Sequence, residues 1–113
     1  MEVLARVKAA RVSPKNLRFV TRSVRGMRVD DAITALRFTS TPLAKIVMKA
    51  VQSAASNAEN NFQMNRDGLR IVKIYADQGP TMKRFRAKPR GRVAPILKRS
   101  SHLTVIVDED EEA

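Results

Sequence analysis

The strongest chemical signal lies in the cations of residues 81–101, a segment that contains no acidic residue. These cations are Lys83, Arg84, Arg86, Lys88, Arg90, Arg92, Lys98 and Arg99. The five cations from Arg84 to Arg92 occupy alternate positions, so in an extended chain they share one face at intervals of about 6.5–7 Å. That repeat is close to the spacing of phosphates along a nucleic-acid strand, and the planar arginine fork pairs phosphate through two hydrogen bonds. The segment therefore predicts an extended arm that binds phosphates.

Residue types that carry catalysis or ligate metals are scarce. The chain has no cysteine and one histidine, His102, which excludes thiol chemistry, Cys-ligated zinc and a His-rich metal site. Ser100 and Ser101 precede His102, but neighbours along a strand point to opposite faces and form no nucleophile–base pair. The four glycines form no phosphate-binding loop. We predict no enzymatic activity, no cofactor, no metal and no small-molecule substrate.

The charge balance supports a polyanionic partner. The chain of 113 residues has 22 Lys and Arg against 11 acids, a formal net charge of +11 and a sequence pI near 11.1. Five of the acids lie in residues 108–113, so residues 1–107 carry a net charge of +16. Such an excess repels itself unless a polyanion neutralises it. A basic surface kept for solubility is the alternative, but the pI lies in the range typical of nucleic-acid-binding domains.

Three helices are expected, in residues 14–25, 30–38 and 42–61. Ser13-Pro14 and Thr41-Pro42 each place a capping residue before a proline, which is typical of a helix start. Gly26 follows the first helix as a stop signal. The first helix carries an apolar stripe, and a separate ridge of cations made of Lys15, Arg18, Arg22 and Arg25.

Three strands, in residues 3–10, 69–76 and 102–107, show β-branched residues or alternation. Pro89 and Gly91 interrupt residues 81–101, which predicts a hairpin with its tip near residues 88–93 that orders fully only against its partner. A disordered basic loop or a nuclear-targeting charge run is the alternative. We therefore predict an α+β fold: three helices packed on a small antiparallel sheet with a long protruding basic β-hairpin. Residues 1–107 form one domain, and residues 108–113 form a mobile acidic tail.

No apolar run reaches the length of about 18 residues that a membrane span requires, and the N-terminus lacks the pattern of a secretory signal. We expect a soluble intracellular protein without a membrane partner.

Short motifs occur in order along nearly the whole chain. They are Arg11-Val-Ser-Pro-Lys15, Leu17-Arg18, Arg25-Gly26, Leu36-Arg-Phe-Thr39, Ser53-Ala-Ala-Ser-Asn-Ala-Glu-Asn60, Gly79-Pro-Thr-Met-Lys-Arg84, Arg90-Gly-Arg92 and Ile96-Leu-Lys-Arg-Ser-Ser-His102. Together they resemble the large-subunit ribosomal protein twenty-two family of the bacterial type. Phe85 with Pro89 in the arm, and the acidic tail, depart from the family pattern.

The resemblance implies a structural constituent of the large ribosomal subunit in the cytoplasm. Its body would lie near the exit of the polypeptide tunnel. Its hairpin would contact several domains of the 23S-type ribosomal RNA and line the narrow part of the tunnel. The implied partners are this RNA, which the protein organises during assembly, neighbouring large-subunit proteins and the nascent polypeptide.

Charge and resemblance together give the candidate site residues. The expected RNA-binding residues are Arg6, Lys8, Arg11, Ser13, Lys15, Arg18, Arg22, Arg25, Lys83, Arg84, Arg86, Lys88, Arg90, Arg92, Lys98, Arg99 and His102. The expected tunnel-lining tip consists of Lys88, Pro89, Arg90, Gly91, Arg92 and Val93. The alternative function is an architectural DNA-bending protein that inserts a proline-tipped basic arm into the minor groove.

Overall fold

Residues 2–109, which the computed structural model describes, form three α-helices and five strands. The helices are α1 (Pro14–Val24), α2 (Val29–Arg37) and α3 (Pro42–Phe62). The strands are β1 (Val3–Ala10), β2 (Leu69–Gln78), β3 (Met82–Lys88), β4 (Arg92–Lys98) and β5 (Ser101–Glu109). Two short 3-10 turns, η1 (Arg66–Gly68) and η2 (Pro89–Gly91), precede β2 and β4.

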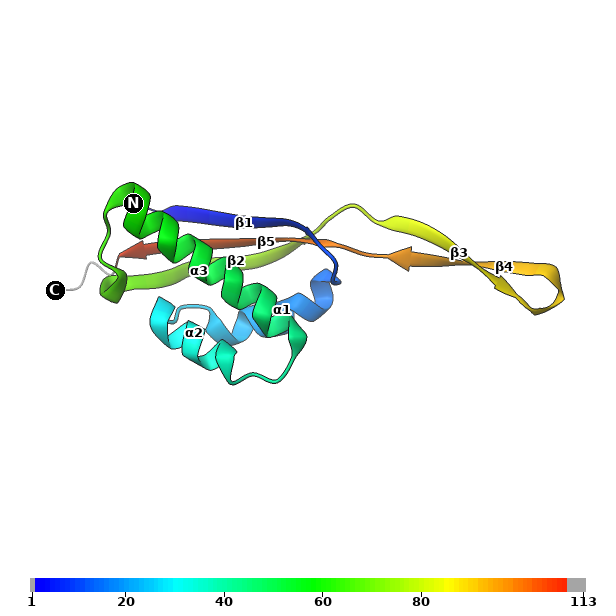
Figure 1. The fold of residues 1–113 in the computed structure, drawn as a ribbon, viewed down its shortest axis with the longest axis horizontal. Helices are drawn as coiled ribbons and strands as arrows, with labels where there is room; N and C mark the ends of the chain where they lie inside the picture. The colour runs from blue at the N-terminus through cyan, green and yellow to red at the C-terminus, as the bar shows by residue number, and fades with distance from the viewer. Residues whose placement is uncertain (1, 110–113) are drawn as a thin grey trace.

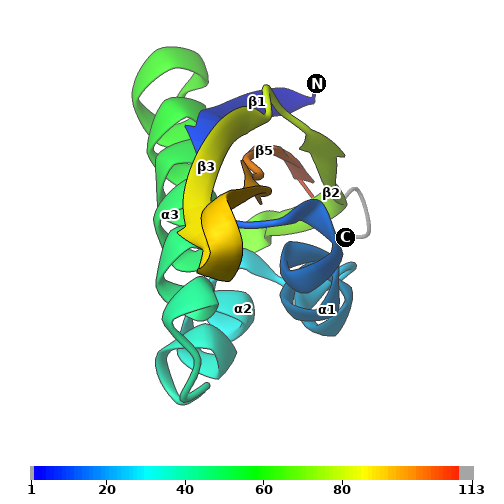
Figure 2. The same cartoon turned by 90° about the vertical axis from the view of Figure 1, so that its right-hand side faces the viewer.

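The strands form two antiparallel units. β5 lies between β1 and β2 in a three-stranded sheet, and β3 pairs with β4 as a hairpin. The helices cover one face of the sheet, with α3 against β1 and β5 and α1 against β2 (Figures 1 and 2). The hairpin projects from the end of the sheet, so the molecule measures 68 × 26 × 18 Å (Figure 1). This arrangement confirms the predicted α+β fold with a protruding hairpin.

The helix ends follow the local signals in the sequence. Each predicted helix occurs, with its ends within one residue of those expected. The Ser13 hydroxyl caps α1 by accepting a hydrogen bond from the Asn16 N–H at 3.4 Å, and Gly26, with φ +81°, follows the helix. Thr41 occupies the capping position of α3, but its side chain makes no capping hydrogen bond. Gln63 ends α3 in the left-handed conformation, with φ 54°.

The core is aliphatic, as the low aromatic content predicts. β5 contributes Leu103, Val105 and Val107 from one face, and all three are fully buried. α3 presents a stripe of small residues to the sheet and to α2. Its buried alanines are Ala44, Ala50, Ala54, Ala55 and Ala58. Because alanine has a short side chain, α3 can lie close to its neighbours, and the packing depends on shape rather than on large side chains.

Hydrogen bonds at the base of the hairpin tie the arm to the body. The Gly79 N–H donates to the Ser100 carbonyl oxygen at 2.9 Å, and the Ser100 hydroxyl donates to the Pro80 carbonyl at 2.6 Å. The Ser101 hydroxyl donates to the Val12 carbonyl at 2.6 Å, which joins β5 to the loop after β1. A Cβ on Gly79 would lie 2.7 Å from the Ser100 Oγ, so any larger residue here would displace the Ser100 hydroxyl.

β5 extends further than the sequence predicts. Glu109 pairs with Leu69 across the sheet, and its Oε1 accepts a hydrogen bond from the Asn65 N–H at 2.7 Å. Asp108 and Glu109 therefore belong to the strand, which the sequence predicts to end at Val107. The remainder of the expected tail, residues 110–113, lies outside the described residues.

Candidate nucleic-acid interface

The hairpin is a regular two-stranded ladder that makes a tight turn at its tip. Pairing runs from Met82 opposite Lys98 to Lys88 opposite Arg92. The turn places Arg90 and Gly91 at positive φ, 64° and 71°. Glycine adopts that conformation readily, whereas arginine does so at a cost of about 1–2 kcal/mol. Every residue of β3 is exposed, so the arm presents its side chains for contact with a partner.

The cations of the hairpin do not form the single row of five that the alternation predicts. The chain reverses at residues 89–91, so Arg90 sits in the turn and Arg92 returns on β4 opposite Lys88. Side chains of cross-strand partners point to the same face of a ladder. The basic face of the hairpin therefore consists of Arg84, Arg86, Lys88, Arg92 and Lys98. It is a two-stranded surface rather than a line.

The opposite face of the hairpin is largely apolar. Phe85 pairs with Pro95, Ala87 pairs with Val93, and Leu97 lies across from Lys83. Phe85 is 70% exposed and Val93 62% exposed, so the body does not cover this face. The alternation of cations does not predict this face, but apolar residues at the odd-numbered positions 85, 87, 93, 95 and 97 are a sequence signal for it. The arm thus offers cations on one side and apolar groups on the other.

The predicted ridge on α1 exists, but two of its arginines also bind the body. An Arg18 Nη2 donates to the Ala76 carbonyl at 3.2 Å, and an Arg25 Nη2 donates to the Ile74 carbonyl at 3.2 Å. β2 is an edge strand, so these carbonyls have no neighbouring strand on that side. Each guanidinium has five N–H donors, which leaves several available for a phosphate.

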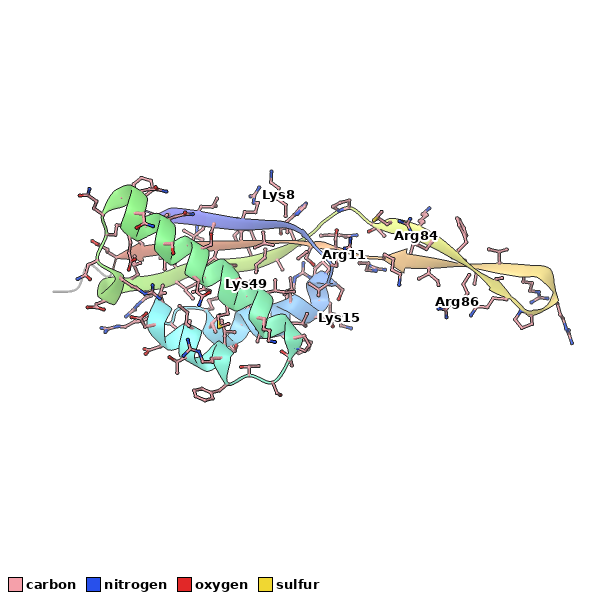
Figure 3. All side chains as sticks on the ribbon, in the orientation of Figure 1. Lys8, Arg11, Lys15, Lys49, Arg84 and Arg86 are labelled. Atoms are coloured by element: carbon pink, nitrogen blue, oxygen red, sulfur yellow. The ribbon has the colours of Figure 1, made fainter. Side chains whose placement is uncertain are left out.

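The start of α1 and the base of the hairpin together form a basic hollow. It has a volume of about 390 Å³ and is lined by Ser13, Pro14, Lys15, Arg18, Gln78 and Arg99. Figure 3 shows Arg11 and Lys15 at the end of the body from which the arm projects, with Arg84 and Arg86 on the arm beyond them. The first N–H groups of a helix also attract anions. The hollow therefore joins the cations of α1 to those of the hairpin.

Other predicted residues lie away from this hollow. Arg6 and Lys8 extend from β1, and Lys8 points away from the helices (Figure 3). The Arg6 Nε donates to the Thr104 Oγ1 at 3.4 Å across the sheet. His102 is partly buried near the start of β5, one residue beyond the buried Ser101. The site residues thus fall on two sides of the body rather than on one continuous surface.

The predicted site residues include neither Phe19 nor the lysines of α3. Phe19 is 68% exposed and lies in a shallow hollow of about 230 Å³ with Lys15, Arg18 and Arg22. Lys45 and Lys49 are exposed one turn apart on α3. Their spacing of four residues indicated a shared helix face, but their distance from the hairpin depends on the tertiary fold.

The two serines beside His102 serve the fold. Both hydroxyls donate to backbone carbonyls at the base of the arm, which leaves neither oriented as a nucleophile. Within residues 2–109, no group of three acidic, histidine or cysteine side chains is arranged to hold a metal ion. The helices of this part of the chain are also too short or too polar to cross a membrane.

Comparison with known proteins gives consistent matches over almost the full length. The family model described as Ribosomal protein L22p/L17e matches residues 5–108. The large ribosomal subunit protein uL22 of Dehalococcoides mccartyi strain 195 is 55% identical over 107 residues, covering 95% of this chain and 98% of the relative. The protein of the same name from Thermoanaerobacter pseudethanolicus is 47% identical over 111 residues, covering 98% and 100%. That from Finegoldia magna is 44% identical over 111 residues, covering 98% and 99%.

Proposed function

The chain belongs to the Ribosomal protein L22p/L17e family, and from this premise we propose that it binds and organises the large-subunit ribosomal RNA during assembly. As a member of this family it is a structural constituent of the large ribosomal subunit in the cytoplasm and not an enzyme. Its proposed partners are the 23S-type RNA, neighbouring large-subunit proteins and the nascent polypeptide. The proposed RNA-binding residues are the ones named under Sequence analysis, of which Arg6 is the first and His102 the last.

The observation that carries this proposal is the acid-free hairpin standing clear of the body. All eight cations of residues 81–101 lie on the arm or at its base. The strands of the arm are seven residues long, so each extends about 23 Å at the usual rise per residue. An isolated two-stranded ribbon is marginally stable in water, and contact with RNA on its basic face supplies the missing interactions.

The body contributes a second set of phosphate contacts. The hollow between α1 and Arg99 lies where the arm leaves the sheet, so RNA that follows the arm reaches the cations of α1. A protein that binds RNA both along the arm and at the body brings distant RNA segments together. Each cation that pairs with a phosphate releases counterions, so binding becomes weaker as the salt concentration rises.

The tip, residues 88–93, is the proposed contribution to the wall of the polypeptide tunnel. It is the part of the chain furthest from the body (Figure 1). Gly91 keeps the turn narrow, and Arg90 and Val93 are exposed there. In this position, the side chains of the tip contact a nascent polypeptide while the basic face is held by RNA.

Replacing arginines of the arm tests the proposal. The hairpin variant replaces Arg84, Arg86, Arg90 and Arg92 by alanine. None of these side chains bonds to the body in residues 2–109, so the fold is expected to persist. We expect the hairpin variant to be depleted from large subunits in cells that also express the unaltered protein, measured by quantitative mass spectrometry of gradient-purified particles.

A matched control separates position from net charge. The body variant replaces Arg28, Arg37, Lys45 and Lys49 by alanine, which removes the same charge from exposed sites away from the arm. It should enter large subunits more efficiently than the hairpin variant. Equal incorporation of both variants after a high-salt wash would show that the arm does not supply the affinity.

A further inference from the structure

The face of the three-stranded sheet opposite the helices is uncovered. Strand alternation turns Leu4, Arg6 and Lys8 of β1 to this face, together with Thr104 and Ile106 of β5. A bulge in β2 turns two successive residues outward. Lys73 pairs with Ile106, Val72 is the extra residue at the register shift between Ile71 and Lys73, and both are exposed. Tyr75 and Asp77 follow on the same face of β2.

A row of three side chains, called the platform below, crosses the middle of this face. Arg6, Thr104 and Tyr75 are cross-strand partners in one row. Thr104 is fully buried although its side chain points to the uncovered face, so its neighbours must lie over it. The Arg6 Nε lies 3.4 Å from the Thr104 Oγ1, and Tyr75 remains 36% exposed. A planar guanidinium and an aromatic ring therefore lie on either side of a short threonine.

Cations flank the platform on both sides along the strands. Lys73 lies two residues before Tyr75 on β2, on one side of the platform. Lys8 lies two residues after Arg6 on β1, on the other side. Each step along a strand is about 7 Å. Within residues 2–109, Arg6, Lys8 and Lys73 make no ion pair.

The carboxylates of the same face do not reverse this charge. The strands bring Asp77 and Asp108 to it, and these lie across the ladder from His102 and Arg70. The remaining positive charge favours a polyanion over a protein, because the centres of protein interfaces are depleted of charged residues. RNA also matches the side chains of the platform, because unpaired bases stack on aromatic rings such as that of Tyr75 and on guanidinium planes such as that of Arg6.

We propose that this open face binds an unpaired nucleotide of RNA, with the base stacked on Tyr75 and Arg6 and the flanking phosphates bound by Lys8 and Lys73. The proposal rests on the RNA-binding function proposed above and adds to the arm and the α1 hollow a further RNA contact, on the side of the body opposite the helices. The proposal adds Tyr75 and Lys73 to the RNA-binding residues. The sheet face binds single-stranded RNA through its bases, whereas the arm binds RNA through its phosphates.

The composition of the chain allows a single fluorophore to report RNA binding at the platform. Tyr75 is the single tyrosine and the chain has no tryptophan, so Tyr75→Trp creates one fluorophore at the platform. We expect a short single-stranded oligoadenylate to quench this tryptophan to saturation, and an RNA duplex of the same length to quench it much less. The matched control is Phe62→Trp, at an exposed position at the end of α3, the helix that packs on the covered face of the sheet. It should show no saturable quenching.

Affinity measurements separate stacking from simple apolar contact. Stacking on an aromatic ring contributes the equivalent of about a 5- to 150-fold change in affinity per base. We expect Tyr75→Leu to weaken oligoadenylate binding within that range and Tyr75→Phe to leave it nearly unchanged. Leucine keeps Thr104 covered, and unchanged thermal unfolding by circular dichroism will confirm that both variants are folded.

Several outcomes would overturn the proposal. These are equal quenching of the two tryptophan variants, equal binding by Tyr75→Leu and Tyr75→Phe, and a response of Tyr75→Trp to purified large-subunit proteins but not to RNA. The last would assign the sheet face to a protein neighbour. Failure of the RNA-binding function itself is a separate result, because the unaltered chain would then fail to bind large-subunit RNA at all.

Discussion

The junction between the sheet and the arm gives a quantitative prediction about Gly79. In Gly79→Ala the new Cβ would lie 2.7 Å from the Ser100 Oγ and 3.3 Å from the Ser100 carbonyl carbon. The hydroxyl must then rotate away, which breaks its 2.6 Å hydrogen bond to the Pro80 carbonyl. Ser100 is only 8% exposed, so water replaces that bond poorly.

The expected cost follows from these contacts. Loss of the hydrogen bond costs about 0.5–1.5 kcal/mol. The remaining contact with the Ser100 backbone adds strain, and the smaller entropy of the unfolded alanine chain offsets about 0.4–1 kcal/mol. We expect a net destabilisation of about 1 kcal/mol. In a chain that already carries Ser100→Ala the hydroxyl is gone, so the same glycine substitution should cost about 1 kcal/mol less.

A double-mutant cycle measured by urea unfolding tests this reasoning. Gly68→Ala serves as the control, because a Cβ there meets nothing within 4 Å and the φ of Gly68 is not positive. It should change the free energy of unfolding by less than about 0.5 kcal/mol. If the costs of Gly79→Ala and Ser100→Ala add to within about 0.3 kcal/mol, the two positions are not coupled and the contact described here is wrong.

Three further predictions concern the arm and the core. For the hairpin variant, the slope of log affinity for large-subunit RNA against log salt concentration should be smaller in magnitude by about 3, because each of the four lost phosphate contacts contributes about 0.7. Equal slopes for the variant and the unaltered protein in filter binding would exclude phosphate pairing by the arm. Gly91→Ala should weaken the tip by about 1 kcal/mol because its φ is +71°, and nuclear Overhauser contacts between Lys88 and Arg92 should decrease while body unfolding is unchanged. Val47→Ala should destabilise the protein by about 2 kcal/mol in urea unfolding, because Val47 is fully buried. Phe85→Ala should change stability by less than about 0.5 kcal/mol, because Phe85 is 70% exposed. A larger loss of stability in Phe85→Ala than in Val47→Ala would contradict the described packing.

Local signals explain why so much of the fold was predictable from the sequence. Ser13-Pro14 and Thr41-Pro42 fix the starts of two helices through backbone geometry that involves only neighbouring residues. The strands carry β-branched residues, and Pro89 with Gly91 marks the turn. The hairpin needs no tertiary contact along its length, so its register follows from the turn itself.

Features that depend on contacts between distant residues were not predictable in this way. The bonds of Arg18 and Arg25 to the edge carbonyls of β2 join residues 58 and 49 positions apart. The bulge near Val72 shifts the outward face of β2, and alternation alone would place Lys73 on the inner face. The uncovered platform at Tyr75 follows from that shift and from the order of the strands, neither of which the sequence pattern determines.

Sedimentation of the tagged protein through a sucrose gradient tests whether the protein is a constituent of the large ribosomal subunit. After a moderate-salt wash, we expect the protein to migrate with the large ribosomal subunit in an amount equal to other proteins of that particle. Recovery with nucleoid DNA would contradict this ribosomal role and favour the architectural DNA-binding alternative. Recovery free at the top of the gradient would contradict it as well, because a constituent of the subunit remains bound through its arm.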